Sequence, residues 1–530
     1  MKKSVKYFCI VLSLVMILGF FAGCNDNNGD YDIATKAELD PEKIGDYSSL
    51  KLPIDNKYTE ISYLHDSDLA DLNDSVFIRE LRRRTGLNVN IIAVPLSAIS
   101  EKAKVLMASK DEMPDIMDHI GGIDVFNDFG KQGAFEEILQ HIDELPNFKK
   151  LFYDEADKYN TEGKIKNFLD GEGNLFMFPR YNISRKVNHG FLYRKDIFDK
   201  HGIKMWTSTE EFLDVLRELK KLYPDSTPFA SKTGDQIFGN FTLNYGLDVM
   251  TGLQPYYDEN EKVWKMSCTD PKFKDCLDLV KTMFDEGLID PEFITATQPA
   301  WTAKMTQKDK AFVTWDWIGR LDMFKEQTLN TIPEYDLRYA EPLEGKVLTL
   351  TNVLTGPAVK KGENSMLALK LLDYMISDSG AILASMGIEG VTFNYGENEK
   401  AEYLGFEDGQ TATTTLLEQK YGICGPLAHR YDNRCAYYNY TEREQEAQDM
   451  MTSKEDGFWP EDPVLTFNEE EKKVIEKHLV SLETAAKEFA TKYVLTGKES
   501  WENWLKKAQS LGADEIVKAY NSAQGRYDKL

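Results

Sequence analysis

Few residues of this sequence occur in patterns that could carry catalysis. The chain contains no GxSxG nucleophile turn, no HExxH zinc motif and no phosphate-binding loop. His119, His141 and His189 could meet in space, but a solvated or capping histidine is the safer interpretation of each. With 88 Asp and Glu residues, paired carboxylates must occur somewhere, so the sequence cannot nominate the acid pair of a glycosidase. We therefore predict a protein that is not an enzyme.

The signal for a metal site is weak. Asp170, Glu172 and Asn174 alternate as the first ligands of a calcium loop do. The glycine of such a loop is displaced, however, and its twelfth position is Tyr181 instead of glutamate. We interpret this stretch as a turn and expect no metal or other cofactor.

The N-terminus predicts export and lipidation. A lysine-rich start precedes the apolar run Phe8–Phe21, which has the length of a signal-peptide core and is shorter than the roughly 20 residues that a membrane-spanning helix needs. The sequence Phe-Ala-Gly-Cys at Phe21–Cys24 resembles the bacterial lipobox, in which small residues precede a lipid-modified cysteine. We expect residues 1–23 to be a signal peptide, Cys24 to carry the lipid anchor, and residues 24–56 to be a polar tether. The protein is then held at the extracytoplasmic face of the cell membrane.

Composition narrows the partners. The net charge is −25, and no basic block remains beyond the signal, so nucleic acid and anionic membrane surfaces are poor partners. We expect a monomer. Two cysteine pairs, Cys268 with Cys276 and Cys424 with Cys435, have neither metal-knuckle nor redox CxxC spacing. Export permits a disulfide in either pair, and free buried thiols fit equally well.

The strands and helices that must position any functional residue alternate along the chain. Tyr58–Tyr63, Leu87–Val94 and Asp115–Met117 are strand-like, with helical patterns at Ser75–Thr85 and Ala98–Ser109 between them. This alternation predicts an α/β fold with a parallel or mixed sheet flanked by helices. Further strands are expected at 174–178, 191–194, 311–315 and 347–354, and further helices at 209–223, 365–377 and 469–493.

An ordered series of motifs carries a resemblance to a known family. The motifs are Met113–Ile116, Asn174–Asn182, Phe191–Asp196, Met283–Phe293, Gly387–Val391 and Val494–Trp504. In this series the chain resembles extracellular solute-binding proteins of ABC importers, in the large lipoprotein branch that serves oligosaccharides and is related to maltose-binding protein. Trp206 stands where the family often has proline, and the segment 398–465 matches poorly.

The resemblance implies a two-lobe periplasmic-binding-protein fold with hinge crossings, a central cleft and extra C-terminal helices. Lobe 1 is expected at residues 57–183 and 352–400, and lobe 2, with the C-terminal helices, at 184–351 and 401–530. The resemblance also implies that an oligosaccharide is captured by lobe closure and passed to the transmembrane permease subunits of an ABC importer.

A sugar offers hydroxyl groups and an apolar C–H face, so its site needs aromatic rings and planar polar groups. Trp315, Asp316 and Trp317 lie at the end of a predicted buried strand, where open sheets place ligands. Strand alternation puts both indoles on one side and the carboxylate on the other, although core packing is the alternative for either indole. Further aromatic candidates, each favouring packing over binding, are Trp206, Trp301 and Trp459.

Other candidates follow from the resemblance. The tripeptide Arg180-Tyr181-Asn182 lies beside the expected first crossing and could contact ligand or shape the hinge. Asp118 and His119 follow a predicted strand and face the cleft if the resemblance holds, with helix capping as the alternative. Glu389 could accept hydrogen bonds from sugar hydroxyls, although its neighbouring glycines also suit a tight turn.

Three other functions are compatible with the sequence. A surface glycan hydrolase would need two carboxylates roughly 5 to 9.5 Å apart across the cleft. A binder of peptides or other solutes on the same fold would grip the ligand's termini with a fixed carboxylate and arginine. A sensor subunit would present its ligand to a membrane kinase. Stacking tryptophans favour a sugar binder.

Overall fold

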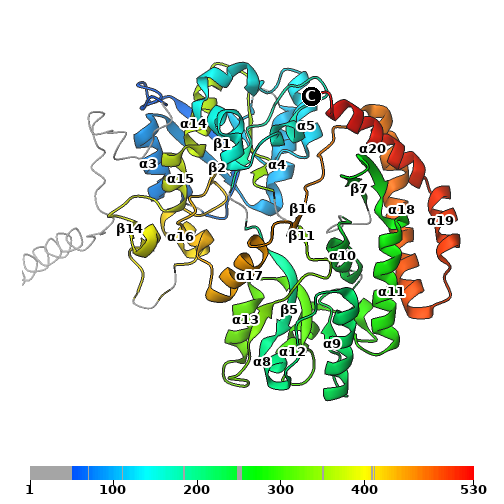
Figure 1. Cartoon of the computed structure of the whole chain (residues 1–530). Helices are drawn as coiled ribbons and strands as arrows, with labels where there is room; N and C mark the ends of the chain where they lie inside the picture. The colour runs from blue at the N-terminus through cyan, green and yellow to red at the C-terminus, as the bar shows by residue number, and fades with distance from the viewer. Residues whose placement is uncertain are drawn as a thin grey trace, which may run out of the picture.

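The computed structural model describes residues 50–530, except for 70, 110–111, 183–184, 235, 248–253, 349–350, 408–409 and 411. The predicted signal peptide, Cys24 and most of the tether lie outside the described residues. Within the ranges given above, no helix is both long enough and apolar enough to cross a bilayer. The chain forms two α/β lobes joined by crossing segments (Figure 1), which confirms the predicted fold class.

The first lobe is built on a four-stranded sheet of order β13-β3-β1-β2. Strands β1 (Glu60–Asp66), β2 (Asn88–Val94) and β3 (Ile116–Met117) run parallel, and β13 (Ala358–Val359) joins β3 antiparallel. Helix α3 (Val76–Thr85) links β1 to β2, and it begins where the Ser75 hydroxyl accepts a hydrogen bond from the Ile78 amide. The other helices of this lobe are α4 (Leu96–Ala108), α5 (Ile123–Lys131), α6 (Pro146–Lys149), α7 (Ala156–Tyr159), α14 (Ser365–Ile376), α15 (Asp378–Ser385) and α16 (Thr414–Tyr421).

The second lobe is built on a sheet of order β10-β5-β9-β6. Strand β9 (Val313–Trp317) pairs antiparallel with β5 (His189–Arg194) and parallel with β6 (Phe229–Ala230), while β10 (Leu337–Tyr339) flanks β5. Helix α9 (Thr209–Leu222) is capped by Ser208 and buries one apolar face, formed by Phe212, Val215, Leu216 and Leu219. The other helices of this lobe are α8 (Lys195–His201), α10 (Gln236–Thr242), α11 (Pro271–Asp285), α12 (Gln298–Met305), α13 (Arg320–Thr328) and α17 (Glu442–Thr452).

Short strand pairs mark the segments that cross between the lobes. Strand β4 (Arg180–Tyr181) pairs with β12 (Val353–Leu354), and β11 (Val347–Leu348) pairs with β16 (Phe458–Trp459). The predicted strand at 347–354 is therefore wrong as one element, because the chain changes partners between β11 and β12. Two hairpins complete the strands: β7 (Pro255–Asp258) with β8 (Val263–Met266), and β14 (Phe393–Tyr395) with β15 (Ala401–Tyr403).

The strand predicted at 174–178 is also wrong. Leu175 donates its amide to the Glu137 carboxylate at 2.9 Å, and its carbonyl accepts from the Ile138 amide at 2.9 Å. The Phe178 amide instead donates to the Pro357 carbonyl at 2.8 Å. The backbone of this segment is thus satisfied by unrelated partners, so no ladder forms although the residue types suit a strand.

The apolar cores divide at a different place from the expected lobe boundary. Ala401, Leu417, Ile423 and Tyr438 belong to the first core, although residues from 401 onward were assigned to lobe 2. The next helix, α17, instead packs Ala447 and Met451 into the core of the second lobe. The chain therefore returns to the second lobe only after Tyr438.

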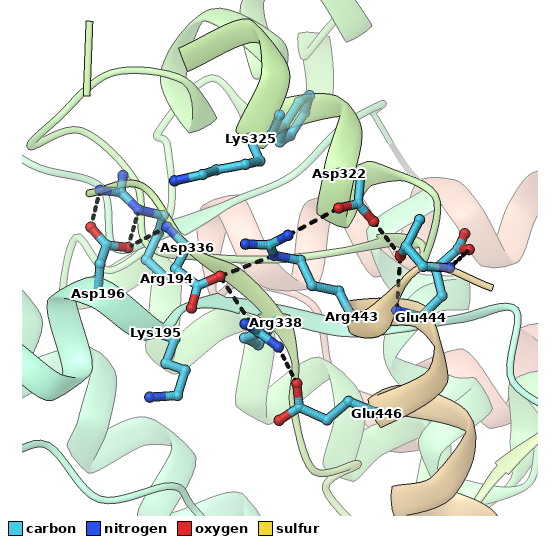
Figure 2. Close-up of polar contacts among 12 residues, drawn as sticks. Arg194, Lys195, Asp196, Asp322, Lys325, Asp336, Arg338, Arg443, Glu444 and Glu446 are labelled. Carbon is cyan, nitrogen blue, oxygen red and sulfur yellow. Dashed lines mark hydrogen bonds and ion pairs between the residues drawn. The ribbon is translucent and has the colours of Figure 1, made fainter. Parts of the chain in front are cut away.

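Ion pairs hold α17 on the second lobe (Figure 2). Arg443 donates to Asp322 on α13 and to Asp336 next to β10, at 3.0 Å in each case. Arg338 on β10 donates to Asp336 at 2.9 Å and also contacts Glu446 on α17. This charged network lies where α17 meets β10 and α13, so the helix is part of the second lobe.

The C-terminal helices α18 (Glu469–Thr496), α19 (Trp501–Ser510) and α20 (Ala513–Tyr527) run along the second lobe (Figure 1). The Trp504 ring stacks on Phe489 with centroids 4.8 Å apart, and its indole N–H donates to the Cys268 carbonyl. At the end of α20 the Tyr527 hydroxyl donates to Asn167 Oδ1 in the first lobe at 2.8 Å. Helix α20 therefore contacts both lobes.

Candidate ligand-binding site

A buried polar cluster occupies the carboxyl ends of β1 and β3 in the first lobe. His65 and Asp66 end β1, and Asp118 and His119 directly follow β3. Because parallel neighbours end at the same sheet edge, these side chains meet: His65 Nδ1 donates to Asp118 Oδ2 at 3.0 Å, and His119 Nε2 donates to Asp66 Oδ1 at 2.7 Å. The backbone of His119 has a φ of 53°, a conformation that non-glycine residues seldom adopt outside turns and functional sites.

Residues far apart in the sequence complete this cluster. Arg180 on β4 forms an ion pair with Asp118. The Tyr63 hydroxyl donates to Asp118 Oδ2 at 3.3 Å and lies 2.8 Å from His429 Nε2, from which it accepts. Arg180 Nε and His429 Nδ1 are buried and have no hydrogen-bond partner among the described residues. The cluster thus retains unused hydrogen-bonding capacity at the edge of the sheet.

The cluster shifts the acidities of its members. Burial by itself would raise the pKa of Asp118, but the Arg180 guanidinium and the His65 hydrogen bond outweigh it and hold that pKa far below its usual range. The hydrogen bond to Asp66 raises the pKa of His119 above 6.5, against the effect of burial. Burial, together with the positive charge of Arg180, lowers the pKa of His429 well below 6.5. Asp118 is therefore ionised at neutral pH, and its carboxylate is engaged by Arg180, His65 and Tyr63.

The Trp315-Asp316-Trp317 segment lies at the end of β9, as predicted. Asp316 is buried and accepts hydrogen bonds from Lys232 Nζ at 2.9 Å and Arg320 Nε at 2.7 Å, whereas both indoles remain partly exposed on the other side. The Trp315 ring stacks on His189 with centroids 5.2 Å apart and an angle of 15°. Each indole also packs against the second lobe's core. The carboxylate of Asp316 is thus occupied, and only the indoles present free surface.

The hinge candidates have structural partners. The Tyr181 amide donates to the His429 carbonyl at 3.0 Å, and its hydroxyl donates to the Tyr159 carbonyl. The Asn182 amide donates to the Asn352 carbonyl at 2.8 Å, and its side-chain oxygen accepts from the Tyr431 amide at 3.0 Å. Both residues therefore shape the crossing segments in this structure.

Glu389 belongs neither to the polar cluster around Asp118 nor to the Trp315-Asp316-Trp317 segment. It is exposed in the loop between α15 and β14, flanked by Gly387 and Gly390 with φ of 89° and 78°. Positive φ at both glycines makes this a tight turn, which was the alternative that the sequence offered.

A cavity of about 1250 Å³ lies at the crossing strands and is lined by residues of both lobes. Ile123 at the start of α5 comes from the first lobe, Tyr256 on β7 from the second, and Trp459 on β16 from the crossing. Figure 1 shows β11 and β16 between the lobes, with β7 and α20 beside them. Of the candidate site residues named from the sequence, only Trp459, for which packing was favoured over binding, is among the described residues that line this cavity. Ile123 follows His119 closely, however, so one loop joins the polar cluster to the cavity.

Trp459 is held firmly in the wall of this cavity. A Cβ added to Gly246 would come within 3.0 Å of its ring, so the bare backbone of Gly246 packs against the indole. The ammonium groups of Lys346 and Lys272 lie 5.0 and 5.8 Å from the ring centroid. The indole Nε1 is buried without a hydrogen-bond partner in the described part of the chain. The ring itself is partly exposed, and a fixed aromatic ring is well suited to the apolar C–H face of a sugar.

Sequence reasoning missed several of these residues. His65 and Asp66 end a strand that was predicted, so the rule that sites gather at the carboxyl ends of strands could have found them. Trp206, Trp301 and Trp459 were named as aromatic candidates with packing favoured over binding. Trp206 and Trp301 are indeed buried and donate their indole N–H groups to Glu341 O and Thr314 Oγ1, whereas Trp459 lies in the cavity wall. No signal in the sequence could have brought His429 to the cluster.

The remaining motifs have local roles. The Asp170 carboxylate accepts from the Glu172 and Asn174 amides at 2.8 and 2.9 Å and closes a turn. In the part of the chain that the structure covers, no group of three or more His, Cys, Asp or Glu side chains could hold a metal ion. His141 contacts Glu136 at 3.2 Å. The thiols of the two cysteine pairs discussed above are buried and free.

Two hinged α/β lobes around a shared cavity define a class of protein that binds a solute between its halves. The model of the family described as "Bacterial extracellular solute-binding protein" matches residues 74–382, which is more than half of the chain. The chain therefore belongs to this family of bacterial extracellular solute-binding proteins.

Individual relatives are more distant. Lipoprotein LipO of Bacillus subtilis (strain 168) is 23% identical over 343 residues, which cover 59% of this chain and 63% of LipO. The solved structure of alginate-binding protein AlgQ2 is similar with a TM-score of 0.63 at 22% identity, over 89% of this chain and 99% of AlgQ2. An ABC-transporter associated solute-binding protein from Bifidobacterium longum infantis, described as binding HMO, has a TM-score of 0.67 at 17% identity, over 89% and 99% of the two chains. At these identities the structural likeness defines the fold.

Proposed function

We propose that this protein is the exported, lipid-anchored binding subunit of an ABC importer and captures an oligosaccharide between its lobes. The observation that carries the proposal is the cavity of about 1250 Å³, which both lobes and the crossing strand with Trp459 line together. Family membership supports the binding of a solute outside the cytoplasm. The names of AlgQ2 and of the Bifidobacterium protein support a carbohydrate and an ABC transporter.

Binding follows from the hinge. A ligand that contacts both lobes does so fully only when they are closed, so it stabilises the closed state by its difference in affinity for the two states. Release of the unaltered ligand to the permease then requires only that the lobes reopen. No bond of the ligand is made or broken in this cycle.

The predicted site residues divide into two groups under this proposal. Trp315, Trp317 and His119 keep exposed side-chain surface at the strand ends, outside the cavity lining, and we expect them to contact the part of the sugar that extends beyond the cavity. Trp459 joins them from the cavity wall. The carboxylates of Asp118 and Asp316 are engaged by Arg180, Lys232 and Arg320, so Asp118, Arg180 and Asp316 position the first group.

Anchoring rests on Cys24, as the lipobox resemblance implies, and on the relative LipO being named a lipoprotein. Substitution Cys24→Ser should release the protein from the membrane fraction into the medium. It should also abolish incorporation of labelled palmitate. A parent protein that incorporates no labelled palmitate would overturn the lipid anchor and leave the binding proposal in place.

The binding function is tested by a thermal-shift screen of the mature chain against neutral and acidic oligosaccharides. A ligand at a hundredfold excess over its dissociation constant stabilises the protein by about 2.7 kcal/mol. Trp317→Ala and Trp459→Ala should weaken or abolish the ligand-induced shift, measured from the lower unliganded midpoint that the loss of each packed ring produces. Tyr153→Ala, which removes an exposed aromatic ring in the first lobe, is the matched control and should respond like the parent.

Other outcomes point elsewhere. A shift with short peptides and none with sugars would replace the carbohydrate by a peptide ligand. Release of shortened sugars during incubation would identify a hydrolase.

A further inference from the structure

The charges around the cavity beside Trp459 limit the kind of sugar that it can hold. Five carboxylate side chains and two lysines line it, and its lining as the structure describes it includes no arginine. The lining carboxylates are Asp258, Glu259, Asp456, Glu461 and Asp462. The lining lysines are Lys272 and Lys346.

The cations near this cavity are already engaged. Four ion pairs hold them: Asp258 with Lys265 at 2.7 Å, Glu259 with Lys262 at 2.5 Å, Glu461 with Lys164 at 2.8 Å, and Asp456 with Lys346. Lys272 donates to the Tyr245 carbonyl at 3.3 Å and lies beside the Trp459 ring. A carboxylate that enters must therefore compete with Asp456 for Lys346, and with a backbone carbonyl for Lys272.

A uronic acid would bind here at a disadvantage. A carboxylate that leaves water needs a well-placed cation, and its burial without one costs several kcal/mol. The strongest partner, the two-pronged guanidinium group of arginine, is missing from the described lining. The lining carboxylates would in addition repel a second negative charge across a partly enclosed space.

A neutral sugar meets no such cost. Its hydroxyl groups can donate to the lining carboxylates, which keep unused lone pairs while they are ion-paired. Apolar C–H faces can cover the aromatic rings of the wall.

The size of the cavity adds a second restriction. A volume of about 1250 Å³ exceeds the range of roughly 300 to 1,000 Å³ that encloses a drug-sized ligand. A single sugar ring would leave most of this space to water, whereas a chain of several rings can contact both lobes.

We propose that this cavity selects uncharged oligosaccharides of several residues and discriminates against oligouronates of the same length. The inference rests on the proposed function and names the chemical class of its ligand.

The test compares probes by isothermal titration calorimetry of the mature chain at about 0.15 M salt, where exposed charges are screened beyond roughly 8 Å. The neutral probes are cellotetraose, xylotetraose, mannotetraose and lacto-N-tetraose, and the acidic probes are tetragalacturonate and tetramannuronate. We expect at least one neutral probe to bind at least tenfold more tightly than either uronate. Equal or tighter binding of a uronate overturns the inference and leaves the sugar-binding function standing. Failure of every probe overturns the proposed function and the inference with it.

A pair of variants isolates the role of charge. Asp456→Asn combined with Glu461→Gln frees Lys346 and Lys164, so the ratio of neutral to uronate affinity should fall at least fivefold. An unchanged ratio would overturn the argument from engaged cations.

The matched control, Asp143→Asn combined with Glu155→Gln, frees two surface lysines, Lys149 and Lys158, in the first lobe. It removes the same number of carboxylates away from the cavity and should leave the ratio as it is in the parent. A fall in both double variants would mean that overall charge, and not the cavity, sets the preference.

Discussion

Replacement of Asp118 by alanine should be among the most destabilising single changes in the first lobe. The carboxylate is 3% exposed and accepts from His65 and Tyr63 while it pairs with Arg180. Its removal leaves the Arg180 guanidinium buried beside two polar groups that have lost their acceptor. Breaking a buried ion pair on one side costs about 3 to 5 kcal/mol. For a lobe of this size that corresponds to a midpoint lowered by roughly 6 to 20 °C.

The tryptophans make this loss measurable lobe by lobe. All eight lie between Trp206 and Trp504, and none belongs to the core of the first lobe. Urea unfolding followed by circular dichroism reports on both lobes, while indole fluorescence reports on the second lobe and the crossings. Asp118→Ala should advance the transition seen by circular dichroism and leave most of the fluorescence transition in place.

The direction of the pH dependence follows from the depressed pKa of Asp118. Its contribution is complete above the ordinary aspartate pKa of about 4 and is lost as the pH falls through the lower folded-state value. The gap between parent and variant should therefore be constant from pH 8 to pH 5. The double variant Asp118→Leu with Arg180→Met removes both charges and should recover most of the stability. A single variant within about 1 kcal/mol of the parent, or a double variant as unstable as the single one, would refute the reasoning.

Three further changes test other parts of the structure. The hydrogen bond to Asp66 raises the pKa of His119, so its stabilising effect is complete below pH 6.5 and fades as the pH rises through the folded-state pKa. The stability that His119→Gln loses, measured by urea unfolding, should therefore be larger at pH 5.5 than at pH 8. An equal loss at both pH values would contradict the ion pair. Gly246→Ala, with φ of 71°, should displace the Trp459 ring and weaken sugar binding in calorimetry at least fivefold, and unaltered affinity would remove this ring from the site. Tyr527→Phe removes the hydrogen bond of α20 to the first lobe, which is worth about 0.5 to 1.5 kcal/mol. The variant should bind ligand roughly two- to tenfold more weakly, and small-angle scattering should show a more open unliganded form. An unchanged scattering curve and an unchanged affinity would contradict this role of Tyr527.

Much of the fold could be predicted because its signals are local. The helix expected at 209–223 is found at Thr209–Leu222, since its Ser208 cap and its apolar spacing lie within one short segment. The strands and helices between Tyr58 and Met117 also lie within a few residues of their expected bounds. The strand predicted at 174–178 is wrong because a strand forms only if a neighbouring strand hydrogen-bonds to its backbone groups.

The residues of the candidate site could be predicted from the sequence, but the partners of their polar groups could not. The alternation at the end of β9 correctly separated Asp316 from its two neighbouring indoles. It could not tell that Lys232 and Arg320 already occupy that carboxylate. In the same way Asp118 and Arg180 were proposed as separate ligand contacts, and the structure pairs them with each other.

By itself the sequence determined the α/β alternation, the caps, the apolar faces and the residue types that end the strands, because each depends on neighbours in the chain and on the period of a helix or strand. Only the tertiary structure decided which polar groups are consumed by partners and which stay available. His429 reaches Tyr63 across 366 residues, and Trp459 enters the cavity wall through a crossing strand that pairs with β11. The physical reason is that desolvation and hydrogen-bond pairing depend on every segment that packs around a group, and no local pattern encodes those segments.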